Sequence, residues 1–507
     1  MKKKIQSFNT ILKKTEQLRK EGKKIVFCHG VFHFLHIGHI RYLKQAKNYG
    51  DFLIVALIAD KYIDKKEDIQ FDELLRSEAV ASLDWIDAVV INPFRSDLEI
   101  VEHIRPDVFV KGFESIEDSR EHESELEHQI KLFEDIDVRL IIAKENEFNS
   151  TSQINKYMQN LPEEIHRYIE IFKKRYSLNS ILGTISAMRD LNVLVIGDTI
   201  LDDYYYCSAI GKSSKDPTLA LKYQSNDVFA GGILAIANHV AGFTSNVDLI
   251  TVIGEKDSYE DFIRENLREC IQPILFTKPN APTLIKRRFL DSYSMTKLLE
   301  VYIMNDSTLK GSFDDNFFQM IKKKLKKYDV VIVGDFGHGA INMNLKNLLS
   351  EKSLYLAVNA QSNAGNRGFN NITQYPRADY ITMAEHEIRL ETRDINGRVW
   401  PMMNRLAGKM SCDKFAVTRG RKGCMMHDRD EGGFIQVPSF AQKVVDRVGA
   451  GDAFFSITSL SVSQKNVPIE VIGFLGNVAG SLSVEMMGNK KSIDNKNVVD
   501  YISGLLS

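Results

Sequence analysis

Short apolar runs alternate with stretches of helical spacing along most of this 507-residue chain. Each run has the length of a buried strand, and the stretches between runs place apolar residues three or four positions apart. Strands that alternate with helices in this way form parallel sheets covered by helices on both faces. We therefore expect an α/β fold built from doubly wound sheets. The runs are residues 24–32, 51–59, 87–94, 106–113, 138–145, 191–206, 247–257, 328–339, 353–361, 378–385 and 414–420.

The runs fall into two series, which predicts two domains. A chain of this length is too long for one hydrophobic core. Between the two series, the stretch PEEIHRYIEIFKKRYSLNSILGTISAMRD has helical spacing and no strand-like run. We place an N-terminal domain at residues 1–160, a helical linker at residues 161–185 and a C-terminal domain at residues 186–507.

The composition excludes several classes of partner. Lysine and arginine together number 66, and aspartate and glutamate number 67. A net charge of −1 provides no attraction toward nucleic acid or an anionic membrane. The five cysteines lack the spacing of a zinc site or a disulfide framework. Because no apolar run reaches the roughly 20 residues of a membrane span and the basic first residues lack a secretory apolar core, we expect a cytoplasmic protein.

The stretch HFLHIGH, residues 33–39, follows the first strand-like run. His36 and His39 fall where a helix is expected to begin, and the amides at a helix start attract phosphate. Gly30 permits the turn after the strand, and Gly38 lets the backbone approach a phosphate closely. Two imidazoles here would donate hydrogen bonds to phosphoryl oxygens as charge develops on them. For this motif alone, ordinary surface histidines are the alternative.

Four motifs of the first domain occur in the order seen in a known enzyme family: GVFHFLHIGHIRYLKQAKNYGDFLIVAL, DELLRSEAV, RPDVFVKG and FNSTSQI. Over about residues 22–157, the chain resembles the cytidylyltransferase-like nucleotidyltransferases, which have a Rossmann-like fold. It is most similar to the adenylyltransferase part of the bifunctional ADP-heptose synthases and to glycerol-3-phosphate cytidylyltransferases. The resemblance implies that His36 and His39 bind the triphosphate and stabilise the transferring phosphorus. It also implies phosphate contacts for Lys47, Arg76, Lys111, Ser150, Thr151 and Ser152.

The chain departs from this family at one position, and one of the matching stretches has a second explanation. The family reads G-x-F-D before the histidine motif, whereas this chain has His33 at the aspartate position. The contact that the aspartate makes with an acceptor or a metal is therefore left unassigned. The three hydroxyl residues 150–152 also fit simple helix capping.

The stretch VVDRVGAGDAFF, residues 444–455, combines a glycine-rich turn with an acidic residue. Consecutive amides of Gly449, Ala450 and Gly451 at the start of a helix make a site for a transferring phosphoryl group. Asp452 follows directly and is placed to take the proton from an attacking hydroxyl. A glycine turn with a capping aspartate is the structural alternative.

Further motifs accompany this stretch: VIGDTILDDY, AGGILAIANHVA, VTRGRKG and GFLGNVAG. Over roughly residues 190–505 they resemble, in order, the PfkB sugar kinases of ribokinase-like fold, especially the kinase half of ADP-heptose synthases. By this resemblance Asp202, Gly231 and Gly232 hold sugar hydroxyls, and Lys286 and Arg288 face the sugar phosphate. The implied nucleotide contacts are Thr418, Gly420, Gly423 and, near the base, Asn477.

Three positions depart from the kinase pattern. The N-x-x-E stretch that supports magnesium and phosphates begins here with Ala384, so that only Glu387 is retained. The D-P-K stretch reads V-N-A around Asn359, and the G-G-A-A-N sugar clamp reads GGILA, with Asn238 as the nearest amide. These changes predict weaker handling of Mg-ATP. Arg367, in a glycine-containing stretch, is a candidate for a replacement anion site.

Together the motifs predict a bifunctional enzyme with the domain order of the ADP-heptose synthases inverted. A sugar kinase and a sugar-1-phosphate nucleotidyltransferase would make a heptose-like activated sugar for surface polysaccharide. We expect Mg²⁺ and ATP as cofactors, with CTP possible for the transferase, and a homodimer with no nucleic-acid or membrane partner. The alternative is an active transferase joined to a kinase-like sensor or dimerisation domain. The sugar, the choice between ATP and CTP, and any metal ligands stay open.

Overall fold

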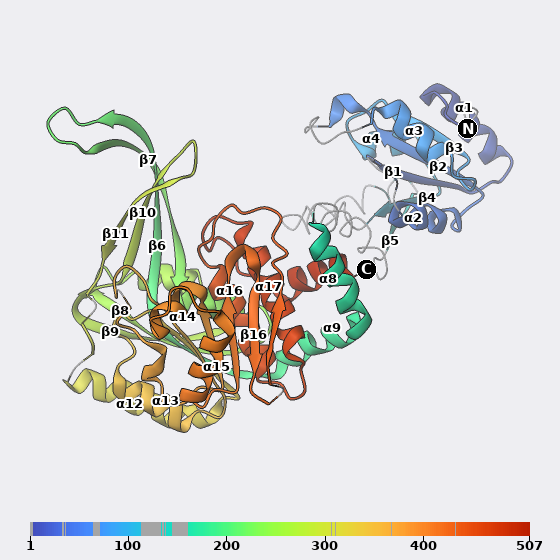
Figure 1. The fold of residues 1–507 in the computed structure, drawn as a ribbon. Coiled ribbons are helices and arrows are strands. Elements are labelled where there is room, and N and C mark those ends of the chain that lie inside the picture. The colour runs from blue at the N-terminus through green and yellow to red at the C-terminus, as the bar shows by residue number, and fades with distance from the viewer. Residues whose placement is uncertain are drawn as a thin grey trace. The chain divides into compact units, whose positions relative to one another are not determined.

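The computed structural model describes residues 4–32, 35, 37–63, 71–112, 133, 136, 138–143, 161–305, 307–309, 311–366, 368–430 and 432–506. The chain forms two compact units, residues 1–156 and residues 157–506. Both are α/β units in which most neighbouring strands run parallel (Figure 1). The expected fold class is confirmed.

The first unit contains a five-stranded sheet in the order β3-β2-β1-β4-β5, with all neighbours parallel. This order reverses direction beside β1, and ligands of such sheets bind at that point, outside the carboxyl ends of the strands. The strands are β1 (Ile25–Gly30), β2 (Phe52–Ile58), β3 (Ala88–Asn92), β4 (Val108–Gly112) and β5 (Arg139–Ala143); the helices are α1 (Phe8–Lys20), α2 (Ile37–Lys47), α3 (Glu73–Ala81) and α4 (Asp97–Ile104).

Apolar side chains cover both faces of this sheet. Consecutive residues of a strand point to opposite faces, so Phe27 joins one cluster with Ile11 of α1 while Val26 and Cys28 join another with Leu43 of α2. Burial on both faces explains why the strand β2 reads as a continuous apolar run in the sequence.

The second unit contains a twelve-stranded sheet. Its main path runs β11-β10-β6-β12-β13-β14-β15-β16-β17, with β7 and β8 also paired to β6, and β9 paired to β8. The strands are β6 (Asn192–Lys212), β7 (Leu219–Gly232), β8 (Asn246–Lys256), β9 (Ile271–Pro282), β10 (Ile285–Asp291), β11 (Lys297–Ile303), β12 (Val330–Asp335), β13 (Leu356–Ala360), β14 (Tyr380–Ala384), β15 (Lys414–Thr418), β16 (Cys424–Asp428) and β17 (Phe434–Val437).

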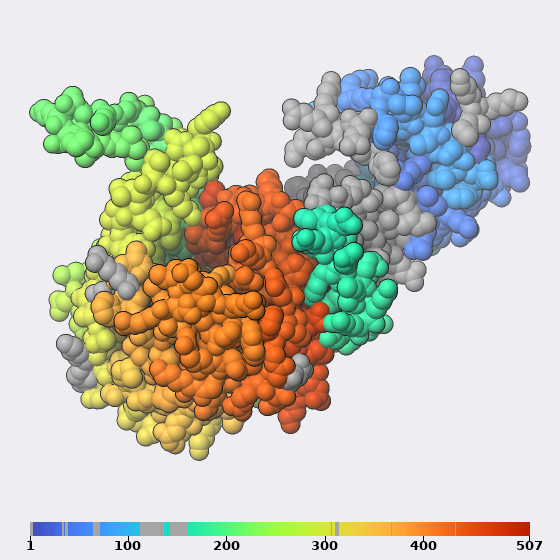
Figure 2. Space-filling model, in the orientation of Figure 1, coloured from blue at the N-terminus to red at the C-terminus, as the bar shows by residue number. Residues whose placement is uncertain are grey.

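Strand β6 belongs to two parts of this sheet. Its first residues pair in parallel with β8 and β12, within the body of the unit. From Thr199 onward it pairs antiparallel with β7, and from Leu201 in parallel with β10. We call the outer part of β6 together with β7, β10 and β11 the projecting strands, because they extend away from the body of this unit (Figures 1 and 2).

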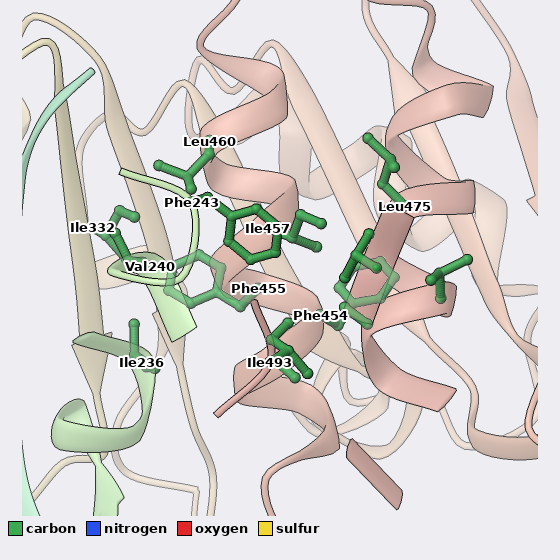
Figure 3. Packing of buried hydrophobic residues seen from close by; sticks show 14 of the residues in the cluster. Ile236, Val240, Phe243, Ile332, Phe454, Phe455, Ile457, Leu460, Leu475 and Ile493 are labelled. Atoms are coloured by element: carbon green, nitrogen blue, oxygen red, sulfur yellow. The ribbon is translucent and has the colours of Figure 1, made fainter. Parts of the chain in front are cut away.

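Helices α16 and α17 form the centre of the largest apolar core of the second unit. In Figure 3, Phe455 and Leu460 of α16 pack beside Ile236 and Val240 of α10. The helices are α8 (Glu163–Arg175), α9 (Leu178–Ala187), α10 (Ile233–Val240), α11 (Glu260–Glu265), α12 (Gly311–Lys324), α13 (Met343–Lys352), α14 (Glu385–Thr392), α15 (Val399–Lys409), α16 (Ala450–Val462), α17 (Ile469–Val484) and α18 (Asn495–Leu506).

The segment expected as a helical linker, residues 161–185, is helical but packs into this same core. Ile169 and Phe172 of α8 are fully buried, and the Phe172 ring stacks on Phe474 of α17 at a centroid distance of 4.4 Å. Arg175 also forms an ion pair with Glu470 at 3.1 Å. Sequence periodicity identifies an amphipathic helix but does not tell which core its apolar face joins. Among the helices of the described residues, none is both long and apolar enough to cross a membrane.

Candidate active sites

The carboxyl edge of the first sheet brings Gly30, Phe32 and His39 together. Phe32 has a positive φ of 46°, and its ring meets the His39 ring edge-on at a centroid distance of 5.3 Å. A Cβ on Gly30 would lie 3.2 Å from the Phe32 ring, so glycine leaves the space that this ring needs. Gly38 lies in the first turn of α2. His33, His36, Ser150, Thr151 and Ser152 lie outside the described residues.

Lys111 stands at the same edge, at the end of β4, and forms an ion pair with Asp97 at 3.0 Å. Beside it, the Asn92 side-chain amide donates to His29 Nε2 at 3.0 Å. Burial lowers the pKa of His29 to about 4. The negative charge of Asp97 opposes this decrease, and the positive charge of Lys111 adds to it. The ring is therefore neutral at pH 7. Sequence reasoning missed His29, Asn92 and Asp97, although each lies within a few residues of a predicted strand end.

Arg76 is buried and serves the scaffold of this edge. Its guanidinium donates to the Ile58 carbonyl at 3.0 Å and to the Val31 carbonyl, and it forms an ion pair with Asp60 at 2.5 Å. These bonds hold together the segments that follow β1 and β2. A phosphate that binds Arg76, as expected from the resemblance, would therefore compete with these three protein acceptors for its N–H groups.

Lys47 lies at the opposite edge of the sheet. Its ammonium forms an ion pair with Asp87 at 2.5 Å and donates to the Asp51 carbonyl at 2.6 Å. These partners directly precede β3 and β2, so they mark the amino ends of the strands. Helix α2 begins near the site but carries Lys47 away from it. The structure does not bring this expected phosphate ligand to His39.

In the second unit, Asp452 lies in the first turn of α16. Gly449 precedes the helix with a φ of +86°, and a Cβ there would lie 2.3 Å from Asn489 Oδ1, so the turn requires glycine. Beside Gly451 the space is open. The first amides of a helix lack intrahelical acceptors, so residues 450–452 offer three donors to a phosphoryl group.

The pKa of Asp452 is raised to about 7, mainly by burial and further by the negative charge of Asp202. Lys286 and a hydrogen bond from Gln361 oppose the increase. The Gln361 amide donates to Asp452 Oδ1 at 3.2 Å. A carboxylate with a pKa near 7 is well suited to accept a proton from a substrate hydroxyl at neutral pH.

The charges of Asp202 and Lys286 act on this carboxylate. Arg288 and Gly231 in turn contact Asp202. Asp202 is buried and paired with Arg288, whose Nε also contacts Glu300 at 2.7 Å. A Cβ on Gly231 would lie 2.1 Å from Asp202 Oδ2, so the carboxylate rests directly on the glycine backbone. Gly232 has a φ of +55° and begins α10. Asp198, missed from the sequence, lies on the same strand as Asp202 and accepts the amides of Phe336, His338 and Ala340.

The expected nucleotide residues form a second group. Gly420 and Gly423 have positive φ values of 56° and 76°, and a Cβ on Gly423 would lie 2.0 Å from the Val437 carbonyl oxygen. Thr418 ends β15 beside them. Asn477 is buried and donates to the carbonyls of Val437 and Pro438 at 3.0 and 3.1 Å. Asn477 therefore holds the segment after β17 in place, and these two carbonyls engage its side-chain amide.

The side chains of Glu387 and Asn238 form hydrogen bonds with backbone groups. The two Glu387 carboxylate oxygens accept the amides of Ser362 at 2.9 Å and Ala384 at 2.7 Å. Asn238 donates to the Asn266 carbonyl at 2.8 Å and accepts the Arg268 amide at 2.9 Å. Asn238 thus clamps a surface segment and does not replace the missing sugar amide. Arg367 lies outside the described residues.

A magnesium ion has few protein ligands available in this unit. No group of three or more His, Cys, Asp or Glu residues close enough to hold a metal occurs in the described part of the chain. Asn359 Oδ1 is nevertheless buried without a hydrogen-bond donor in that part. Mg²⁺ in phosphoryl-transfer sites takes most of its ligands from phosphates and water. Of the two groups at the altered positions, Asn359 offers its Oδ1 to an ion held in that way, whereas both Glu387 oxygens already accept backbone amides.

The two units match different family models. Residues 27–156 match the cytidylyltransferase-like family, and residues 351–496 match the pfkB family of carbohydrate kinases. The second unit also resembles the crystal structure of phosphofructokinase-2 from Escherichia coli in complex with potassium. The TM-score is 0.51 at 14% identity, covering 62% of this chain and 99% of that one. At this identity the likeness concerns the fold alone.

Among curated proteins, the chain is similar to bifunctional proteins HldE. It is 24% identical to that of Rhodopseudomonas palustris over 53% of this chain and 55% of the relative. It is 40% identical to that of Aliarcobacter butzleri over 21% of this chain and 23% of the relative. Each match thus spans less than two thirds of the relative. Two separate stretches of the chain are thus similar to a cytidylyltransferase-like domain and, after it, to a pfkB-family carbohydrate kinase domain.

Proposed function

We propose that the chain makes a nucleotide-activated, heptose-like sugar in two steps. The second unit phosphorylates a sugar or sugar phosphate, and the first joins a sugar 1-phosphate to a nucleotide with release of pyrophosphate. The observation that carries the proposal is the position of Asp452, buried in the first turn of α16 within the electrostatic reach of Asp202 and Lys286. A sensor domain has no need of a carboxylate whose pKa is close to 7.

In the kinase step, Asp452 accepts the proton of an acceptor hydroxyl as its oxygen attacks the γ-phosphorus of ATP. The bond between that phosphorus and the bridging oxygen to the β-phosphate breaks, and ADP leaves. The amides of residues 450–452 stabilise the charge on the transferring group. Mg²⁺, when bound, would offset the phosphate charge. Asp202 orients the acceptor from its place over Gly231.

In the transferase step, an oxygen of the sugar 1-phosphate attacks the α-phosphorus of the nucleotide and pyrophosphate leaves. We propose that His39 and His36 donate to the phosphate oxygens. Lys111, opposite Asp97, would neutralise charge at the same edge. Either ATP or CTP fits this chemistry, because the reaction takes place at the α-phosphorus that both nucleotides carry.

We also propose that the protein is a cytoplasmic homodimer. The projecting strands expose apolar side chains that a single chain leaves uncovered, and such surfaces commonly mark interfaces. They include Ile210, Leu219, Tyr223, Leu299 and Val301. Sedimentation equilibrium at micromolar concentration is expected to give twice the chain mass.

The alternative function keeps the transferase and makes the second unit a sensor or dimerisation module. It is favoured by the engagement of Glu387 with two backbone amides and by Ala384 at the position of the missing amide. A product assay separates the two functions. Purified protein is mixed with a panel of sugars and sugar phosphates and with each nucleoside triphosphate, and products are identified by mass spectrometry. Formation of ADP and a new sugar phosphate supports the kinase; pyrophosphate and a nucleotide sugar alone support the sensor.

A further inference from the structure

Arg419 lies at the carboxyl edge of the second sheet, beside the residues expected to contact the nucleotide. Ala384 and Thr418 are the last register partners of the parallel strands β14 and β15. Glu385 and Arg419 follow them directly, so both residues leave the sheet at this edge. Their side chains meet there, because Arg419 Nε donates to Glu385 Oε2 at 2.9 Å. Ligands of parallel sheets bind outside the carboxyl ends of the strands, which puts Arg419 where a nucleotide can reach it.

The guanidinium of Arg419 uses only part of its hydrogen-bonding capacity. An arginine side chain carries five N–H donors, and in the described residues only the Nε donor of Arg419 has an acceptor. Within the same residues the two terminal nitrogens form no hydrogen bond, although the side chain is only 15% exposed. A guanidinium that is held at Nε and has both terminal nitrogens unpaired fits an acceptor of bidentate geometry, such as a phosphate.

Arg389 shows the opposite arrangement around the same carboxylate. Its Nε and Nη2 donate to Glu385 Oε1 at 3.2 and 2.7 Å, and its Nη1 donates to the carbonyls of Ile395 and Gly397 at 2.7 and 3.1 Å. The hydrogen bonds from Arg389 and Arg419 lower the pKa of Glu385 against the opposing effect of burial, so this carboxyl is ionised at pH 7. One carboxylate between two guanidiniums leaves one positive charge. Because every nitrogen of Arg389 already has a protein acceptor, the cation available to a ligand is Arg419.

This cation adjoins a position at which the chain departs from the kinase pattern. Ala384 stands where the resemblance has an asparagine that supports magnesium and phosphates. A methyl group can bind neither a phosphate nor the water ligands of an ion. Glu387, the retained member of that stretch, accepts two backbone amides with its carboxylate oxygens. A guanidinium fixed at this edge provides positive charge for phosphate oxygens without the lost amide.

We propose that Arg419, oriented by Glu385, binds the terminal phosphates of the nucleoside triphosphate in the second unit and offsets the support lost at Ala384. The inference rests on the proposed kinase function and adds to it a nucleotide-binding residue that the sequence motifs did not single out. An Arg419 that only bridged α14 and the end of β15 would be indifferent to the phosphates of the nucleotide. The binding role and the bridging role therefore differ in whether the phosphates matter.

Calorimetric titration of the full chain in a His39→Ala background tests this role with ATP, AMP and adenosine, in EDTA so that no metal ion contributes. Because ATP can also bind the first unit, only differences between variants are read. Arg419→Gln is expected to weaken ATP binding about tenfold or more, the loss of a charge-assisted bidentate contact, and to leave AMP and adenosine binding unchanged. Arg419→Lys keeps the charge but not the planar fork and is expected to recover part of the affinity. Arg421→Gln is the matched control, because Arg421 is exposed in the same loop.

Unchanged ATP affinity in Arg419→Gln, an equal loss in Arg421→Gln, or an equal loss of AMP or adenosine binding overturns the assignment. A kinetic readout separates this inference from the kinase function. In sugar-dependent ADP formation, Arg419→Gln is expected to raise KM for ATP and to leave KM for the sugar unchanged. If calorimetry gives the expected loss but no sugar elicits ADP formation from the parent chain, the kinase function fails while the phosphate contact of Arg419 stands.

Discussion

The carboxyl edges of the two sheets use charged residues in different ways. In the first unit, Arg76, Lys47 and Lys111 are each paired with a carboxylate of the protein, and Lys47 lies at the amino edge of the sheet. In the second unit, Asp202, Lys286 and Asp452 come from three distant parts of the chain and influence one another electrostatically. Cations that lie near a motif in the sequence therefore often belong to the scaffold, whereas groups that converge from separate parts of the chain are better candidates for chemistry.

The largest effect is expected from Asp452→Asn. Because the amide retains the size but cannot accept the proton, phosphoryl transfer should fall by about 10²- to 10⁴-fold. Nucleotide binding and pyrophosphate release by the first unit should be unchanged. Sugar-dependent ADP formation and nucleotide affinity by calorimetry measure the two effects. If Asp452→Asn phosphorylates sugar at the wild-type rate, the second site is not a kinase site as we describe it.

In the first unit, His39→Ala should reduce pyrophosphate release by about 10²- to 10³-fold, the cost of losing one donor to a developing charge. Kinase activity should be retained, which makes this variant the counterpart of Asp452→Asn. Circular dichroism checks that the fold persists. Full pyrophosphate release by a folded His39→Ala protein would remove the histidine from the transferase mechanism.

The pH profile of the kinase should reveal the Gln361 contact. Asp452 is active when deprotonated, so activity should rise with pH through about 7. The Gln361 hydrogen bond lowers this pKa, and Gln361→Ala should therefore move the rise to higher pH. A shift of one unit would cost about tenfold in activity well below the pKa and little above pH 8.5. An unshifted profile would show that Gln361 does not tune the base.

The smallest effect is expected from Lys47→Met. Its partly exposed ion pair with Asp87 contributes about 0–1 kcal/mol, so the free energy of unfolding should change little. KM for the nucleoside triphosphate should stay constant, because Lys47 lies at the far edge of the sheet. Lys111→Met is the matched variant and should raise that KM. An increase in KM for Lys47→Met as large as that for Lys111→Met would contradict the placement described here.

The sequence predicts the inner strands of both sheets well. Each predicted apolar run forms a strand, because burial on both faces leaves a continuous apolar signal. The projecting strands and β9, β16 and β17 were not predicted. Strands β7 and β11 are largely exposed, so that their apolar residues, frequent in β11, do not mark a core. Strand β10 contains the charged stretch KRR within a half-buried strand. Such strands are specified by their partners rather than by a local pattern.

For the sites, the motifs predict roles for Asp452, Asp202 and His39, and glycines lie close to each of these residues in the sequence or in space. They do not reveal that Lys47 points to the wrong edge, because a helix of 11 residues is about 16 Å long and separates its two ends across the sheet. Nor do they reveal that the buried His338 ring forms no hydrogen bond with the described residues, because its surroundings come from residues far away in sequence. The direction in which a side chain points, and whether its polar atoms are hydrogen-bonded, depend on the folded chain and cannot be predicted from a local motif.

The 21-residue strand β6 connects the body of the second unit to the projecting strands. Asp198 is anchored in the body by the 336–340 loop, whereas Asp202 begins the outer part that pairs with β10 and carries the contact to Arg288. Three residues of β6 separate these two carboxylates. Along β6, the body and the projecting strands are therefore joined through a short segment that has a buried carboxylate at each end.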